Sequence, residues 1–517
     1  MSFTKTPEVD FSSVGLITDV PSHSLPQGAW SDCLNIRCKD GSVQGVNVFE
    51  DGFPLFTSSN TGIRDGKAMA VTQFLEAGGS NLVIAYIVKD ASGDGHVVTY
   101  NTGTSTYLNL TNALTPNQFT FDDRYPPQIY VFNELLIVNP ANDAPPMFSD
   151  DVNTAGSLVT LPNWPSDSHG SKLVTRILKP FNNRLMAMNI FEEHQATADD
   201  DEFLPIDILW SSHITGIGSI DAVEWSYDGI NTAGDAFAVE TPGKILDGGQ
   251  LGEYFIAYKT DAVIRVRETG DTYVLAFESI FEDDGIYSAR CFANIGNAQH
   301  LVIGNYGVYL HDGQSQKEDI AKGLFQDVMF NSVKATKKDK SFCFQQTRDK
   351  EVWFCFPSKT ISGDGCDRAF VFDYSTRKLH LRSLPNISDA FETEQNGELK
   401  IYAAKEGAAA EIQILSSTVF EENGFFIRVN DNYKDSAYKW INAIHLDSMN
   451  SVQISVVGTN SITDTAVYSL QTFNPTTDYK LDFRTSGRYM NIKVQMLGAS
   501  NPLLGRMQFE LKVAGKR

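Results

Sequence analysis

The sequence predicts an all-β protein, with a β-propeller-like body of about six or seven small antiparallel sheets and a C-terminal β-sandwich. Short β-rich runs separated by tight turns recur along most of the chain, at a period of roughly 40–50 residues. The 33 Phe, 19 Tyr and 39 Gly suit sheets joined by turns. Few stretches have the 3.6-residue periodicity of a helix, and the best candidate, residues 317–332, is short.

The repeated unit is clearest in residues 296–320, GNAQHLVIGNYGVYLHDGQSQKEDI. Residues 300–303 are β-rich, residues 305–307 form a turn, residues 308–310 alternate, and Asp312-Gly313 is a hairpin signal. Small antiparallel sheets that repeat along a chain close radially, as a propeller or a related toroid. The remaining strands expected in the body are 81–88 and 96–100, 128–138, 176–188, 206–210 and 222–227, 254–259, 262–267 and 273–279, 341–346, 351–357, 369–374 and 378–382, and 399–403 and 411–415.

The first 63 residues are expected to form an extended arm, because prolines interrupt them and their apolar residues are scattered. Residues 25–53 within this arm contain a predicted hairpin that turns at Lys39-Asp40-Gly41, and Trp30 is expected to anchor the arm.

The propeller-like domain is predicted to span residues 64–419, and the C-terminal sandwich residues 420–517. An acidic insertion, residues 192–205, interrupts one propeller unit and is expected to be a loop. The sandwich is predicted because residues 451–458, 488–496 and 507–513 alternate between apolar and polar side chains.

The net charge of −22 disfavours binding to nucleic-acid phosphates or to an anionic membrane surface. The densest basic site, residues 337–340, is one turn long. Solubility alone explains such a charge, and a surface that DNA must pass without being held is the more specific alternative. Six cysteines without a CxxC pair predict free, mostly buried thiols in a protein made in a reducing cytoplasm. No secretory signal is visible, and no apolar run is long enough to span a membrane.

Catalytic signatures are weak throughout the chain. No Gly-x-Ser-x-Gly elbow, HxxxH pair or phosphate-binding loop is present. Ser226–Gly229 only partly matches a sialidase-type turn, and no carboxylate pair stands out as a glycosidase site. Asp90–Gly95 resembles the first half of a calcium loop, but Asn101 stands where the bidentate acid belongs. We therefore predict no enzymatic activity, no cofactor and no metal site.

Several stretches, taken together and in order, resemble a family of short-tailed (podovirus-like) bacteriophage tail proteins, the nozzle or hub proteins beneath the portal. They are LPQGAWSDCLNIRCKDGSVQGVNVFEDGF at residues 25–53, ILWSSHITGIGSIDAVEW at 208–225, the stretch YKTDAVIRVRETGDTYVLAFESIFEDDGIYSARCFANIGNAQHLVIGNYGVYLHDG at 258–313, and RTSGRYMNIKVQMLGASNPLLGRMQFELKVAGKR at the C-terminus. Each motif is made of turns and aromatic residues, and their succession carries the specificity. The acidic insertion departs from the pattern.

The resemblance implies a virion protein that is assembled in the host cytoplasm as a ring, a homohexamer, around a channel. Its expected partners are a tail adaptor or tail tube protein and tail fibres or a needle, while DNA only passes through the lumen. Acidic side chains around that lumen would repel DNA phosphates. The candidates for this role are Asp199, Asp200, Asp201, Glu202, Glu282, Asp283 and Asp284.

A propeller that binds or degrades glycans is the alternative function. Such a site needs exposed aromatic side chains beside carboxylates, and the candidate aromatic residues are Trp164, Trp210, Trp225 and Trp353. Most of them lie in or beside predicted strands, where packing is the commoner role.

Overall fold

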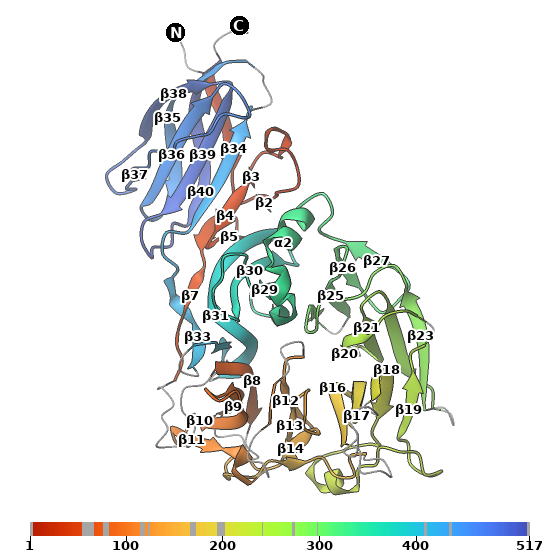
Figure 1. Cartoon of the computed structure of the whole chain (residues 1–517). Coiled ribbons are helices and arrows are strands. Elements are labelled where there is room, and N and C mark those ends of the chain that lie inside the picture. Colours follow the sequence, from red (N-terminus) through yellow and green to blue (C-terminus); the bar gives the residue numbers. More distant parts are fainter. Residues whose placement is uncertain are drawn as a thin grey trace.

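A ring of small antiparallel sheets and a separate two-sheet sandwich make up the protein in the computed structural model (Figure 1). The sandwich lies beyond one edge of the ring, and both termini lie at its far end (Figure 1). The structure describes residues 4–53, 67–75, 82–113, 119–121, 125–165, 172–193, 202–239, 241–270, 274–296, 298–395, 397–407, 411–433 and 437–513.

Five blades of the ring are four-stranded sheets whose strands follow one another in the sequence. We number the blades in chain order. Blade 1 contains β8 (Lys67–Leu75), β9 (Leu82–Lys89), β10 (Gly95–Asn101) and β11 (Thr106–Asn109). Blade 2 contains β12 (Gln128–Phe132), β13 (Leu135–Asn139), β14 (Met147–Ser149) and β15 (Val159–Thr160). Blade 3 contains β16 (Lys172–Phe181), β17 (Arg184–Glu193), β18 (Glu202–Trp210) and β19 (Gly234–Phe237). Blade 4 contains β20 (Ile245–Leu251), β21 (Tyr254–Lys259), β22 (Val263–Glu268) and β23 (Leu275–Phe281). Blade 5 contains β24 (Phe292–Ile295), β25 (Gln299–Ile303), β26 (Val308–His311) and β27 (Lys317–Asp319).

Blades 6 and 7 share one long strand, β31 (Lys378–Gln395). Its first part pairs with β30 and its second part, from Ile387 on, pairs with β32. The outermost strand of blade 7 is β7, which comes from the N-terminal segment and pairs with β33. The other strands of these blades are β28 (Phe342–Gln346), β29 (Glu351–Phe356), β30 (Cys366–Asp373), β32 (Glu398–Lys405), β33 (Glu411–Phe420) and β7 (Asn47–Asp51). The described residues thus form seven blades, and strands from the two ends of the propeller sequence meet in the last one.

The hydrophobic core of the ring lies between neighbouring blades. Separate apolar clusters join blades 1 and 2, blades 2 and 3, blades 3 and 4, and blades 6 and 7. A further cluster packs Val71 of β8 against Tyr402 of β32, so blade 7 contacts blade 1 and the ring is closed. The first strand of a blade lies nearest the axis, where β8 contacts both β12 and β31. The prediction of an all-β, propeller-like body is confirmed.

The sandwich consists of two sheets, and the apolar core between them is continuous with apolar residues of blades 4, 5 and 6. The first sheet has the order β38-β35-β40-β6-β5, with β1 also paired to β40, and the second has the order β37-β36-β39-β34-β4. Its C-terminal strands are β34 (Phe425–Asp431), β35 (Lys439–Ser448), β36 (Val452–Thr459), β37 (Gln471–Phe473), β38 (Leu481–Gly487), β39 (Tyr489–Met496) and β40 (Leu504–Val513). Its N-terminal strands are β1 (Thr4–Asp10), β4 (Asp32–Leu34), β5 (Ile36–Lys39) and β6 (Ser42–Gly45).

The N-terminal segment differs from the expected free-standing arm, because its strands complete sheets in both bodies. The strands β1, β4, β5 and β6 belong to the sandwich and β7 belongs to blade 7, while β2 (Gly15–Leu16) and β3 (Ala29–Trp30) pair in parallel. The expected hairpin is present, and Asp40 and Gly41 both have positive φ angles at its turn. Trp30 is fully buried and stacks on Phe426 of β34, as expected of an anchor.

Helical structure is sparse and short. The helix expected over residues 317–332 is confined to α2 (Gln326–Ser332), because residues 317–319 pair with β26 as the strand β27. Single 3-10 turns occur at η1 (Ser22–Ser24), η2 (Leu110–Ala113), η4 (Ile217–Ala222) and η5 (Ala335–Lys340). The expected loop 192–205 is shorter in the structure, because β17 runs to Glu193 and β18 begins at Glu202.

Candidate functional site

The acidic residues expected to line a channel do not form one cluster. Asp199, Asp200 and Asp201 lie outside the described residues. Glu202 is exposed at the start of β18 in blade 3, whereas Glu282 and Asp283 are exposed in the turn that follows β23.

Asp284 is a correction to that set, because it is buried and only 5% exposed. Its carboxylate accepts a hydrogen bond from the backbone N–H of Asn305 at 2.9 Å. It therefore fixes the turn between β25 and β26 and presents no charge to a channel. Its neighbour Asp283 forms an ion pair with Lys317 at 2.8 Å.

A chain of partly buried charges links the inner strands of several propeller blades. Lys179 of β16 lies 3.3 Å from the Asp247 carboxylate of β20, and that carboxylate accepts a 2.6 Å hydrogen bond from the backbone N–H of Arg290. The Arg290 guanidinium in turn forms an ion pair with Asp389 of β31 at 3.1 Å. The second Asp389 oxygen accepts the backbone N–H of Val71 in β8 at 3.0 Å. Blades 3, 4, 5, 7 and 1 are thereby tied together at the centre of the ring.

We call Lys179, Asp247, Arg290 and Asp389 the axial network. Its charged groups bind other groups of the protein. Arg290 also donates to the Ser388 carbonyl at 2.8 Å and lies over the Phe342 ring, with 5.0 Å between the guanidinium and the ring centroid. Burial raises the pKa of Asp389, although Arg290 and the Val71 N–H partly offset that effect. Because these groups already bind one another, a ligand on the axis would find few free polar atoms.

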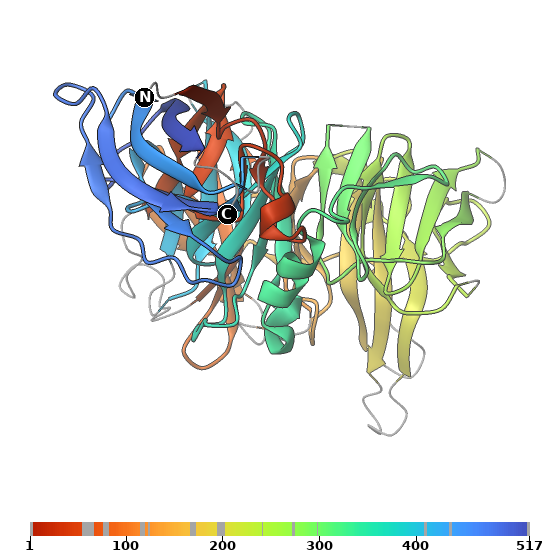
Figure 2. The ribbon, with the colours of Figure 1, turned by 90° about the horizontal axis from the view of Figure 1, so that it is seen from above.

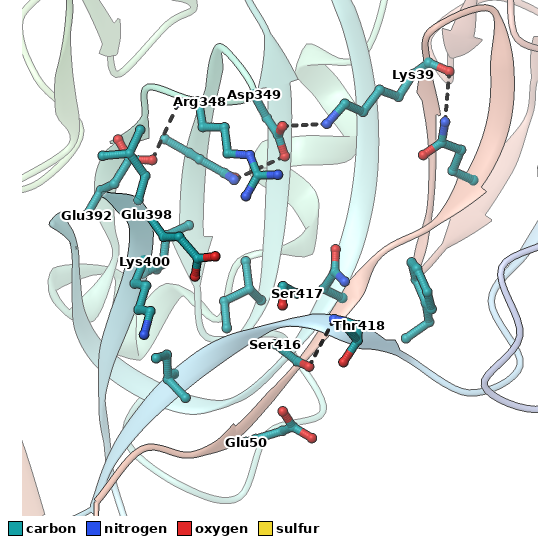
Figure 3. A pocket seen from close by; sticks show the side chains of 18 of the residues that line it. Lys39, Glu50, Arg348, Asp349, Glu392, Glu398, Lys400, Ser416, Ser417 and Thr418 are labelled. Carbon is teal, nitrogen blue, oxygen red and sulfur yellow. Dashed lines mark hydrogen bonds and ion pairs between the residues drawn. The ribbon is translucent and has the colours of Figure 1, made fainter. Parts of the chain in front are cut away.

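A cavity of about 780 Å³ lies between blades 6 and 7 and the sandwich. Figure 3 shows that its walls come from the β5–β6 hairpin with Lys39, from the turn after β28 with Arg348 and Asp349, and from the β31–β32 hairpin with Glu398 and Lys400. The second half of β33, around Ser416, closes another side. We call this space the junction cavity.

Ion pairs join the two bodies at the wall of the junction cavity. Arg37 of β5 lies 2.8 Å from Asp349 and 3.2 Å from Glu351, and Lys39 lies 2.5 Å from Asp349. Burial alone would raise the pKa of Asp349, but Arg37 and Lys39 together hold that pKa below its usual value. Burial dominates at Glu351 and raises its pKa despite the nearby Arg37.

The free groups of the junction cavity are suited to recognition. Arg348 and Glu398 are exposed on its rim, and the buried Gln346 side chain has an Oε1 atom without a hydrogen-bond partner. The carboxylate of Glu392 holds the turn between β28 and β29 in place, because it accepts a hydrogen bond from the Thr347 N–H at 2.8 Å. The described lining contains neither cysteine nor histidine, and its serine hydroxyls lie beside no base that could activate them. The arrangement fits a partner segment with polar and charged side chains.

A third polar cluster is sealed inside blades 4 and 5. The Tyr258 hydroxyl lies 2.7 Å from Nδ1 of His300 and 2.7 Å from Nε2 of His311. Burial lowers the pKa of His300 to about 3, with His311 as a second cause, and lowers the pKa of His311 to about 4. All three side chains are buried, so the cluster has no access to a substrate.

The four tryptophans considered for glycan binding are packing residues. Trp210, Trp225 and Trp353 are 7%, 2% and 1% exposed. Trp164 is half-buried against Trp225, with 4.6 Å between the ring centroids. None of them offers the free aromatic face that a sugar needs.

The described residues contain neither a metal-binding cluster nor a membrane-spanning helix. No group of three or more His, Cys, Asp or Glu in that part of the chain could hold a metal ion. Across the same residues, no helix has both the length and the apolar character that crossing a bilayer requires.

Sequence reasoning missed the axial network and the ion pairs of the junction cavity. The usable signal was a charged residue inside a strand that is otherwise apolar, as at Asp247 in ILDGGQL. Neither Asp247 nor Asp389 could be placed from the sequence, because β20 and the second half of β31 were not predicted as strands.

Comparison with known proteins gives no family. No protein-family model matches the chain, and no curated protein matches it. Among solved structures, the WD40 domain of Pan2 from Neurospora crassa aligns with a TM-score of 0.37 and 7% sequence identity. The alignment covers 69% of this chain and 91% of that domain.

Proposed function

We propose that this chain is a structural virion protein, a tail nozzle or hub whose copies form a ring at the distal end of a short bacteriophage tail. The ordered series of sequence motifs described above suggests this role. The ring would channel DNA during ejection, dock to an adaptor or tail tube, and carry fibres or a needle nearby.

The observation that carries the proposal is the axial network. Lys179, Asp247, Arg290 and Asp389 bind one another and the backbone across the centre of the propeller. A propeller that acts on a small ligand at its axis needs a cavity with free polar groups there. A propeller that serves as a rigid building block needs its blades tied together, which is what these ion pairs do.

The network also bears on where DNA would pass. These ion pairs hold the inner strands of one propeller together, so we place the channel for a duplex between copies. Residues 47–419, which span the propeller, contain 28 Lys and Arg against 50 Asp and Glu, and so carry the whole net charge of −22. Propellers facing a lumen would repel DNA phosphates and prevent the genome from adhering.

Electron microscopy of the purified chain at rising concentration tests the proposal. We expect closed rings with a central channel, and antibody labelling of assembled particles at the tip of the tail. Monomers at every concentration, together with no label on particles, would contradict the proposal. The glycan-binding alternative has no comparable support, because its candidate tryptophans are packed inside the protein.

A further inference from the structure

The outer edge of blade 3 has the features of a protein-docking surface. The strand β19 ends the sheet order of this blade, so its outer side is unpaired in the described structure. Phe237 at its end is 60% exposed, and Val239 just beyond it is 68% exposed. A groove of about 300 Å³ separates this edge from blade 4, where Ile264 and Phe277 line it.

Two buried hydroxyl groups in the groove lack partners. Thr241 is only 4% exposed, and its Oγ1 atom has no hydrogen-bond partner among the described residues. Ser279 Oγ, on the opposite wall of the groove, also has no hydrogen-bond partner among the described residues. Both oxygens are already hidden from solvent, so a partner in the groove would meet its exposed apolar side chains and not these hydroxyls.

The other face of this edge carries acidic charge without a counter-charge. Asp207 of β18 is directly opposite Phe237 and Asp235 lies two residues from Phe237, so all three side chains are on the face turned away from Ile208 and Ala236, which pack toward blade 4. Burial raises the pKa of Asp207 to about 6, with Asp235 and Glu202 as further causes. Asp207, Asp235 and Glu202 form no ion pair in the described part of the chain. The edge therefore favours a partner with apolar and basic side chains.

The outer sheet face of the sandwich carries exposed aromatic and basic side chains, and its carboxylate Glu510 is already paired with His445 at 2.9 Å. Trp440 of β35 is 46% exposed and Tyr479, just before β38, is 81% exposed. Trp440 is directly opposite Lys512 of β40, and Arg484 is exposed on the neighbouring strand β38. Trp, Tyr and Arg are the residue types that contribute most to protein–protein binding energy.

Charge distinguishes between the possible pairings. The sandwich segments, residues 1–46 and 420–517, contain 14 Lys and Arg and 14 Asp and Glu, so they are neutral, whereas the propeller carries −22. Contact between two propellers would bring two bodies of like charge together. Contact between a propeller and a sandwich avoids that repulsion and covers both exposed apolar surfaces.

We propose that copies of this chain associate head to tail, with the blade-3 edge of one copy seated on the outer sandwich face of the next. Figures 1 and 2 show blade 3 and the sandwich at opposite ends of the molecule, so the same contact can repeat. A repeating contact between two different surfaces gives a ring when it closes and a filament when it does not. The choice of a second copy of this chain as the partner rests on the proposed ring function. The exposure of the two surfaces is observed independently of that function.

Two surface variants test the contact by complementation. Phe237→Ser alters only the edge and Trp440→Ser alters only the sandwich face, and each is expected to weaken self-association at least about 30-fold. Each variant should sediment as a monomer at concentrations where the unaltered chain assembles. An equimolar mixture should form a dimer and nothing larger, because one intact edge and one intact face remain. The matched control is Tyr306→Ser, which removes a 68% exposed aromatic side chain from blade 5 and should assemble normally.

The outcomes separate this inference from the proposed function. If the unaltered chain forms rings and Phe237→Ser does so equally well, the contact is wrong while the ring function stands. If both variants are monomers and their mixture stays monomeric, the head-to-tail arrangement is wrong. An unaltered chain that remains a monomer at every concentration overturns the head-to-tail contact, and the labelling of assembled particles then decides the ring function separately. Circular dichroism and melting temperature confirm that each variant is folded.

Discussion

Replacing Trp30 should loosen the sandwich far more than any exposed aromatic change. Its side chain is fully buried, its ring lies 5.0 Å from that of Phe426 at an interplanar angle of 17°, and its indole N–H donates to the Phe11 carbonyl at 2.9 Å. Removing a buried Trp side chain costs about 3–5 kcal/mol through lost transfer energy and the cavity left behind. Trp30→Ala should therefore lower the stability of the sandwich by about that amount.

A second variant separates packing from hydrogen bonding at this position. Trp30→Phe retains an aromatic ring to stack on Phe426 but leaves the Phe11 carbonyl unpaired, which costs about 1–3 kcal/mol. Hydrogen exchange of the β34 amides measures the local free energy of opening for each variant. Trp440→Ala is the matched control, since a partly exposed Trp should change that free energy by no more than about 0.5 kcal/mol. A loss below about 1 kcal/mol for Trp30→Ala, or equal losses for the two Trp30 variants, would refute the reasoning.

Three further predictions concern buried polar groups. Arg290→Met removes the guanidinium partner of Asp389, while the backbone N–H that binds Asp247 is retained, and it should cost about 3–5 kcal/mol in thermal or urea unfolding. Adding Asp389→Asn should restore part of that loss, and a loss under about 1 kcal/mol would contradict an axial role. Because the folded-state pKa values of His300 and His311 lie near 3 and 4, below the ordinary 6.5, the unfolded chain binds more protons in that interval. Stability should therefore fall as the pH drops from 6.5 toward 4, and His300→Gln should flatten the dependence of the urea midpoint, whereas an unchanged slope would count against it. All six cysteines are free, and burial raises the pKa values of their thiols. Ellman's reagent should therefore label fewer than one thiol per native chain and six thiols after unfolding. Rapid labelling of the native chain would contradict this prediction.

Local turn chemistry explains why the hairpins could be predicted well. Asn133 and Glu134 both have positive φ angles in the turn between β12 and β13, where the sequence indicated a hairpin. The helix expected over 317–332 was mostly wrong, because Lys317 pairs with His311 in a short hairpin. The Asp312-Gly313 turn signal in the sequence indicated this hairpin, and it outweighed the helical periodicity of the residues that follow.

The acidic candidates show the limit of reading charge from sequence. Asp283 and Asp284 are neighbours in sequence, yet the first is exposed beside Lys317 and the second is buried beneath a turn. Which of two adjacent carboxylates meets solvent depends on how the following blade packs, and composition holds no information about that. The charge partition between propeller and sandwich, in contrast, can be counted from the sequence once the two bodies are delimited.

The sequence by itself determined the class of fold, because strand alternation and turn residues are local properties that recur in every blade. It also determined the net charge and the position of the C-terminal strands. Only the tertiary structure decided how the ring closes, since β7 reaches β33 from more than 350 positions away in the sequence. It likewise brought Lys179, Asp247, Arg290 and Asp389 together on one axis. Those contacts join residues far apart in the chain, and their energy exists only once the blades are packed.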